Sequence, residues 1–306
     1  MSNNAIDIFK SNNREIIRSL SFSDLFLQKI QDILKESQPN PRLIPVIPTL
    51  VELCISNFPE LIDRFSFILD LLSLSNHLCI CYMFEKIVQN SEILIPFQIW
   101  LKNEGLVERI CLLLANDSIE ESLCVNLFQI LIQCSENIIF EPEFCRHSVL
   151  NAILKTPSNN SQCCLNLQWK LIGMVFSEDN QSILIESLSK EILMIIQPSG
   201  LFYYQYQVYA LDVLKKIYFD SSTQITEQKS LFSLLLLVIQ TYPNHSIAHD
   251  AVLGFFLEFS SKTSDHQVIK EDIIPKVLFL MEISDNLTQK ALFRQFINKF
   301  YQIIPV

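Results

Sequence analysis

Glycine is scarce in this chain, with only four among 306 residues. Folds with many tight reversals place glycine where φ is positive, because other residues rarely adopt that conformation. A nucleotide-binding loop needs several closely spaced glycines, and four scattered ones cannot form it. The scarcity therefore argues against a sheet-rich fold and a phosphate-binding loop. It favours helices joined by short polar breaks, such as residues 37–40, 157–160 and 242–244.

Charged residues are also few, at 18% of the chain, where about 25% is usual for a soluble domain. The formal net charge is −10, and we find no run or stripe of Lys and Arg. Nucleic acid and anionic membranes attract basic surfaces, so neither is expected as a partner. Apolar residues make up 49%, including 22 Phe, which is enough for a continuous core. The composition leaves two explanations open: a partner covers part of the surface, or the core is thick and well filled.

Long hydrophobic segments are missing as well. Apolar runs such as Leu78 to Phe84 and Leu234 to Ile239 are far shorter than the ~20 residues that span a bilayer. The first residues have no basic stretch followed by an apolar one, so no secretory signal is expected. An odd number of cysteines without framework spacing argues against a disulfide scaffold, and we expect a cytoplasmic or nuclear protein. The nine cysteines are Cys54, Cys79, Cys81, Cys111, Cys124, Cys134, Cys145, Cys163 and Cys164.

What the sequence does contain is apolar residues at three- and four-residue spacing, the pattern of amphipathic helices. One helix is predicted from Ser23–Asp24 to Glu36, with an apolar stripe of Leu25, Phe26, Ile30, Ile33 and Leu34. Gly105 is predicted to end another. Further helices are predicted at 13–20, around 50–55, and at 61–72, 77–90, 96–101, 106–114, 118–135, 163–176, 182–196, 203–218, 226–240, 246–260, 268–281 and 287–301, with a helix start at 141–143.

Helices of roughly 12–18 residues with short connections are typical of armadillo and HEAT arrays, whose periods are roughly 40–47 residues. No clean sequence repeat of that period is evident. The predicted fold is therefore all-α, an irregular armadillo/HEAT-like α-solenoid of stacked helix pairs in one domain, residues 1–306. Trp100 and Trp169 lie within apolar helical runs and are both predicted to be largely buried.

Histidine and cysteine offer two candidate metal groups. On a helix, His77 and Cys81 share a face while Cys79 points away, and the adjacent Cys163 and Cys164 face apart. A structural zinc site needs four ligands at characteristic spacing, which neither group supplies. We therefore expect no metal and no other cofactor, and interpret the cysteines as core residues.

His245 and His249 lie four residues apart at the predicted start of a helix. The helix of zinc proteases has Glu directly after its first histidine, whereas this chain has Ser246. A capping or inter-helix hydrogen bond is the expected role of the two histidines. The chain has no G-x-S-x-G elbow, and a Cys–His nucleophile assembled only by the fold stays open. We expect no catalytic residues and hence no enzyme.

An aromatic cluster spans residues 202–209, with Phe202 followed by Tyr203, Tyr204, Tyr206 and Tyr209. Tyrosine is enriched at binding hot spots, because it combines a large apolar area with a polar tip. Four tyrosines in seven residues cannot all face one core, so at least one should reach the surface. Packing between adjacent helices is the alternative interpretation.

Several short motifs occur in order along the chain. They are Phe9–Leu20, Leu53–Ile55 with Ile62–Asp63, Tyr82–Val88, Trp100–Leu101 with Leu106–Val107, and Tyr242–Pro243 with His249 and Val252. Together they resemble the SAPS-domain family. Its members have a Lys and Asn before a short apolar helix, a Cys-containing run before an Asp, a Tyr-Phe-Ser-Lys-Val element, a Trp-Leu helix, and Tyr-Pro followed by His and Val.

The resemblance implies a function. Members of the family are regulatory subunits of protein phosphatase 6-type serine/threonine phosphatases, so the expected partner is such a catalytic subunit, with a further scaffold subunit as an additional expectation. The chain departs from the family at Asn244, where members have Trp, and around Ser122–Asn126, where only Ser122 matches. It is also shortened between Gln89 and Pro96, and the acidic tail that many members carry is not expected after Val306. No protein-binding residues are therefore carried over. A generic armadillo-type adaptor is the alternative function.

Overall fold

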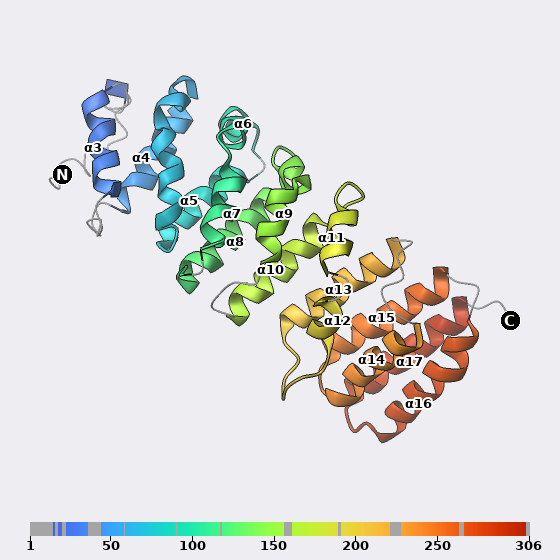
Figure 1. Ribbon diagram of the computed structural model, residues 1–306. Helices are drawn as coiled ribbons and strands as arrows, with labels where there is room; N and C mark the ends of the chain where they lie inside the picture. The colour runs from blue at the N-terminus through green and yellow to red at the C-terminus, as the bar shows by residue number, and fades with distance from the viewer. Residues whose placement is uncertain are drawn as a thin grey trace. The chain divides into compact units, whose positions relative to one another are not determined.

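The computed structural model describes residues 15, 18–19, 23–35, 44–57, 59–89, 91–116, 118–155, 161–188, 191–220, 228–262 and 266–303. Within these residues the chain forms helices and turns, with no strand (Figure 1), which confirms the all-α prediction. The helix expected at 13–20 lies mostly outside them. The chain divides into two compact units, Met1–Val175 and Phe176–Val306. The prediction of one domain over residues 1–306 stays a prediction.

The first unit follows the predicted helices closely, with four main differences. The helix start predicted at 141–143 opens a short 3₁₀ helix, and a separate α-helix begins at His147. Residues 61–72 belong to a 3₁₀ helix instead of an α-helix, and the helix expected from 118 begins at Glu121. A short 3₁₀ helix also precedes Ile95. Its elements are α3 Asp24–Lys35, α4 Val46–Asn57, η1 Pro59–Leu74, α5 Leu78–Val88, η2 Glu92–Leu94, α6 Ile95–Asn103, α7 Leu106–Leu114, α8 Glu121–Ser135, η3 Glu141–Cys145, α9 His147–Leu154 and α10 Gln162–Val175.

The apolar stripe predicted for the first of these helices, α3, is wrong at Leu25. Leu25 is 67% exposed, whereas Leu27 is buried. α3 packs against η1, and residues two positions apart on a helix point to nearly opposite sides. The buried face is thus the one that carries Leu27. The other four members of the stripe have side chains outside the described set.

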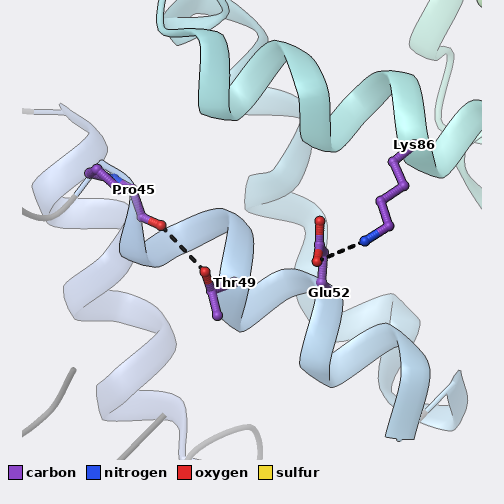
Figure 2. Close-up of polar contacts among 4 residues, drawn as sticks. All are labelled: Pro45, Thr49, Glu52 and Lys86. Carbon is purple, nitrogen blue, oxygen red and sulfur yellow. Dashed lines mark hydrogen bonds and ion pairs between the residues drawn. The ribbon is translucent and has the colours of Figure 1, made fainter. Parts of the chain in front are cut away.

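α4 shows how proline and polar contacts are accommodated. Pro48 lies in its first turn, where a missing N–H costs no helical hydrogen bond. Thr49 donates its hydroxyl to the Pro45 carbonyl oxygen at 3.5 Å, and Lys86 of α5 lies 3.1 Å from Glu52 (Figure 2). An exposed ion pair of this kind contributes about 0–1 kcal/mol. Burial of Leu50, Val51 and Ile55 is therefore the main stabilising contribution of α4.

Gly105 separates α6 from α7. Its φ of 77° lies in the left-handed region that favours glycine, and its N–H donates to the Lys102 carbonyl oxygen at 3.0 Å. A left-handed glycine just past a helix satisfies carbonyls of the last turn. The predicted helix end at this residue is confirmed.

The second unit differs from prediction at two places. The helix expected over 182–196 is two helices, and the one expected from 268 opens with a π-helical turn. That turn precedes Pro275, which has no N–H to donate, and the Ile274 N–H bonds instead to Ile269. The elements are α11 Gln181–Leu188, α12 Glu191–Ile196, α13 Gln205–Asp220, α14 Gln228–Thr241, α15 Ser246–Lys262, η4 Ile269–Ile273, α16 Ile274–Ile283 and α17 Leu287–Ile303.

Within each unit, helices that are not consecutive along the chain pack against one another. In the first unit α8 contacts both α5 and α10, and α7 contacts α9. In the second unit α15 contacts both α13 and α17, while α14 packs on α15 and α16 on α17 (Figure 1). A row of neighbouring helices therefore runs through each unit, α5, α8 and α10 in the first and α13, α15 and α17 in the second.

A buried polar side chain joins the two helices of several hairpins. Gln98 on α6 donates to the carbonyl oxygens of Ile87 and Gln89 at the end of α5, at 2.8 and 2.7 Å. Gln168 on α10 does the same for α9. The last carbonyls of a helix have no partner within it, so a buried side-chain donor satisfies them.

The same arrangement continues in the second unit. Gln207 on α13 donates to the Ile195 carbonyl at 2.8 Å, and His249 on α15 contacts the Tyr242 carbonyl at 2.9 Å. Gln289 on α17 accepts a hydrogen bond from Ser284, just after α16. From Gln168 onward, these positions recur about every 40 residues, close to the armadillo and HEAT periods. The chain thus carries a repeat of buried polar positions that its apolar residues do not reveal.

Candidate functional site

A groove of about 230 Å³ opens on the surface formed by α13, α15 and α17. Its polar lining consists of Asp212 and Lys215 on α13, Asp250 on α15, and Gln295 and Lys299 on α17. These side chains come from three helices that are packed neighbours, so the groove crosses the hairpin repeat. Its position on rigid helices makes it a candidate binding site.

Gly254 lies in the groove at the middle of α15. A Cβ built on this residue would meet no heavy atom within 4 Å, and Gly105 is the positive-φ glycine among the described residues. Neither close packing nor backbone conformation therefore requires a glycine here. Glycine inside a helix costs about 1 kcal/mol relative to alanine. Its effect is to leave the backbone of α15 open to approach from the groove.

Apolar side chains complete the lining. Leu253 and Phe296 are buried, while Leu257 and Leu292 are half-buried at the groove. A bound chain would thus contact apolar surface next to the charged groups. This combination of apolar floor and a few charged groups is typical of sites that bind peptides or small molecules.

The basic side of α13 is neutralised within the protein. Lys215 lies 2.7 Å from one carboxylate oxygen of Glu258, and Lys262 lies 3.0 Å from the other. Partial burial raises the pKa of Glu258, but the hydrogen bonds and charges of the two lysines outweigh it and hold that pKa below its usual range. Lys215 is therefore already engaged in an ion pair with Glu258.

Asp212 and Asp250 differ from Glu258 in this respect. No described residue forms a hydrogen bond or ion pair with either carboxylate. Partial burial raises the pKa of Asp212, the charges of Lys215 and Lys216 oppose this rise, and the neighbouring charge of Asp250 adds a smaller increase. The groove thus holds two neighbouring carboxylates that would both be stabilised by a cation.

A second hollow lies in the first unit, between η1 and α7, with a volume of about 490 Å³. Leu69, Leu72 and the exposed Leu112 line it, together with one acid, Asp70, and one base, Arg109. Its charges are balanced and it lacks an opened backbone like that at Gly254. The groove on α13, α15 and α17 is therefore the stronger candidate.

The first candidate metal group, His77, Cys79 and Cys81, differs in burial from one member to the next. His77 precedes α5 and is half-buried, as is Cys79, while Cys81 is buried. The Cys81 thiol lies 3.7 Å from Glu85 Oε1 and 3.9 Å from the Asn126 carbonyl oxygen. Burial, together with the charge of Glu85, raises the pKa of Cys81 to about 12. Cys81 therefore stays a neutral thiol in the core.

The second group, Cys163 and Cys164, also divides. Cys163 is exposed, which is a correction to the expectation of a core residue, because α10 turns this position toward water. Cys164 is buried against Cys124 of α8, and the hydrogen bond between these thiols, with burial, raises the pKa of Cys124. Among the described residues, no three His, Cys, Asp or Glu side chains are grouped so that they could hold a metal ion.

The two histidines of α15 have the predicted structural roles. His245 Nδ1 accepts a hydrogen bond from the Ala248 N–H at 3.1 Å, which caps the start of α15. His249 is buried, contacts the Tyr242 carbonyl, and stacks on Phe293 of α17 with ring centroids 5.8 Å apart. Capping and inter-helix bonding are both confirmed.

The aromatic cluster is divided between core and surface. Tyr203 is buried, donates to the Ile196 carbonyl at 3.1 Å and packs against Tyr242. Tyr204 and Tyr206 stack on each other with centroids 5.7 Å apart and are half-buried. Phe202 is 67% exposed. Packing between helices accounts for Tyr203, whereas Tyr204, Tyr206 and Tyr209 are only half-buried and Phe202 reaches the surface.

Of the two tryptophans, Trp169 is 4% exposed, which confirms the prediction. Trp100 is only half-buried, stacking on Phe97 with ring centroids 5.4 Å apart, so its placement in the core is wrong in part.

Sequence reasoning also missed Asp212, Asp250 and Gly254. The sequence did contain one signal, Gly254 itself. A glycine inside an apolar helical run lowers the stability of the helix, which indicates that the position has a packing or functional role.

The comparisons with known proteins leave the family open: neither family models nor curated protein sequences match this chain. Among the helices that the structure describes, none has the length and apolar character needed to cross a bilayer.

Proposed function

We propose that this chain is a non-catalytic regulatory or scaffold subunit that binds the catalytic subunit of a protein phosphatase 6-type serine/threonine phosphatase. In this proposal the hairpins stack as an irregular armadillo/HEAT-like α-solenoid. The recurrence of buried polar positions about every 40 residues supports the stacking, since repeats of that length build such arrays. A further scaffold subunit can join the complex, which we place in the cytoplasm or nucleus.

The observation that carries the binding role is the groove across α13, α15 and α17. Three neighbouring helices present charged side chains, apolar surface and an opened backbone on one face. A helical stack with such a face binds another chain by contacts spread over several helices. A scaffold that tethers a catalyst to its substrate raises the effective concentration of that substrate.

The phosphatase partner rests on the resemblance to the SAPS-domain family. Of the matching residues that the structure describes, Leu101, Leu106, His249 and Val252 are buried to 2% exposure or less, while Tyr82 and Pro243 are exposed. Buried residues support a shared fold more than a shared surface. A generic armadillo-type adaptor is therefore the second candidate, because core resemblance fits it equally well.

Affinity purification of the full chain, followed by mass spectrometry, separates the two candidates. If the chain regulates a phosphatase, a serine/threonine phosphatase catalytic subunit should be the dominant co-purified protein, recovered in an amount equimolar with the chain. Transport or cytoskeletal proteins in its place would favour the adaptor and contradict the phosphatase role. An unrelated helical protein of similar acidity, purified in parallel, controls for nonspecific capture.

A further inference from the structure

The groove carries carboxylates on the side of α13 and α15. Lys215 is bound to Glu258, and neither Asp212 nor Asp250 forms a hydrogen bond or ion pair with a described residue. Both carboxylates are exposed, and the charges of Lys215 and Lys216 attract Asp212. Lys299 belongs to α17, and α15 contacts both α13 and α17. The carboxylates that a ligand can reach thus lie on α13 and α15, and a lysine lies on α17.

We propose that this groove binds an extended peptide segment of a partner protein, with one Lys or Arg side chain between Asp212 and Asp250 and the peptide main chain over Gly254. The inference rests on the proposed binding role and specifies the chemistry of the partner. Charge complementarity selects the basic side chain, because two neighbouring carboxylates would otherwise repel each other. The missing Cβ at Gly254 gives a main chain its closest approach to α15.

The dimensions of the groove select an extended segment. A volume of about 230 Å³ is below the 300–1,000 Å³ typical of small-molecule pockets. A helix with side chains is about 10–12 Å across and would need a wider trough. A few extended residues fit, with their apolar side chains on Leu257 and Leu292. Lys299 then faces the part of the peptide on the α17 side and donates to a carbonyl or acidic group there.

A phage-displayed library of random decapeptides, selected on the full chain, tests this chemistry directly and needs no identified partner. Selected peptides are expected to share one Lys or Arg next to apolar residues. Synthetic copies should lose about tenfold or more in affinity with the double variant Asp212→Lys/Asp250→Lys, because each reversed charge repels the ligand. The matched control Glu282→Lys/Asp285→Lys changes the net charge equally at positions outside the groove and should stay within about twofold.

Gly254→Leu provides an independent variant, since its side chain fills the groove without a new charge, and it should also weaken binding about tenfold or more. Circular dichroism checks the folding of each variant. If the charge reversal unfolds the chain, Asp250→Asn replaces it and must lower affinity at least about threefold. Selection of peptides without a shared basic residue, or equal affinity for the groove and control variants, would overturn the inference.

The outcome is distinguishable from that of the phosphatase experiment. If the phosphatase subunit binds wild-type chain and Asp212→Lys/Asp250→Lys alike and no basic peptide is selected, the proposed function stands and the groove inference fails. If basic peptides are selected and no phosphatase is captured, the groove inference stands and the phosphatase role fails.

Discussion

The side-chain amide nitrogen of Gln168 on α10 lies 2.7 Å from the carbonyl oxygen of Ile153 on α9, and at the same distance from that of Lys155. One buried side chain thus satisfies two carbonyls at the end of the neighbouring helix. The contact fixes how the two helices of the hairpin meet, because the donor reaches both acceptors in a single register.

Replacing this donor should destabilise the chain. Gln168→Leu keeps the approximate volume but leaves the two carbonyls without their buried partner, which costs about 1–3 kcal/mol of unfolding free energy. Urea unfolding monitored by circular dichroism measures the loss. The control is Gln162→Leu at the exposed start of the same helix, expected within about 0.5 kcal/mol of wild type. Equal effects of the two substitutions would contradict the role of Gln168.

His249 should make stability depend on pH. Burial lowers its pKa below the 6.5 of an unfolded chain, and nearby His245 lowers it further, against hydrogen bonds to the backbone of Tyr242 and Ile239 that raise it. Between the folded and unfolded pKa values the unfolded chain binds more protons, so the unfolding free energy rises with pH up to about 6.5 and then levels off.

Urea unfolding at a series of pH values between about 5 and 7.5 measures this slope. His249→Gln removes the titrating group but keeps a donor for the Tyr242 carbonyl, so the slope should decrease. His147→Gln, at an exposed histidine, should leave it unchanged. An identical slope in His249→Gln and wild type would show that His249 is not the responsible group.

The two tryptophans should differ in their contribution to stability. Trp169 is 4% exposed, so Trp169→Ala should cost about 3–5 kcal/mol, the range for large aromatic residues in cores. Trp100 is half-buried on Phe97, and Trp100→Ala should cost distinctly less, because part of its surface already contacts water. Denaturant unfolding of the two variants compares them, and a larger loss for Trp100→Ala would contradict their observed burial.

Gly254→Ala should stabilise the protein. The added methyl group meets no atom within 4 Å, and the helix gains the better propensity of alanine, about 0.5–1 kcal/mol. Thermal unfolding measures the gain. Gly105→Ala provides the opposite case, because alanine at a φ of 77° costs about 1–2 kcal/mol. A destabilised Gly254→Ala would mean that packing, and not access to the groove, requires the glycine.

Most helices could be predicted from the sequence because their apolar spacing depends only on which residues share a face. Their orientation was harder to predict: Leu25 is exposed and Leu27 buried because α3 packs on η1, which no local pattern records. The 3₁₀ geometry of η1 was missed for the same reason. The groove could not be predicted from the sequence either, since Asp212, Asp250 and Lys299 come together only when α13, α15 and α17 pack.

The repeat could have been found in the sequence by a different search. Gln168, Gln207 and Gln289 are polar residues inside apolar helices, and each needs a buried partner. Apolar residues at helical spacing occur throughout the chain and therefore hide a period, whereas buried polar residues are few. Their recurrence about every 40 residues is the clearer signal of stacked hairpins.

The most direct test of the proposed function is reconstitution from pure components. This chain and a protein phosphatase 6-type catalytic subunit are mixed at micromolar concentration and analysed by size-exclusion chromatography with light scattering. The expected result is a single species with the summed mass of one copy of each protein. Separate elution of the two proteins, under conditions where both are folded, would contradict the regulatory role.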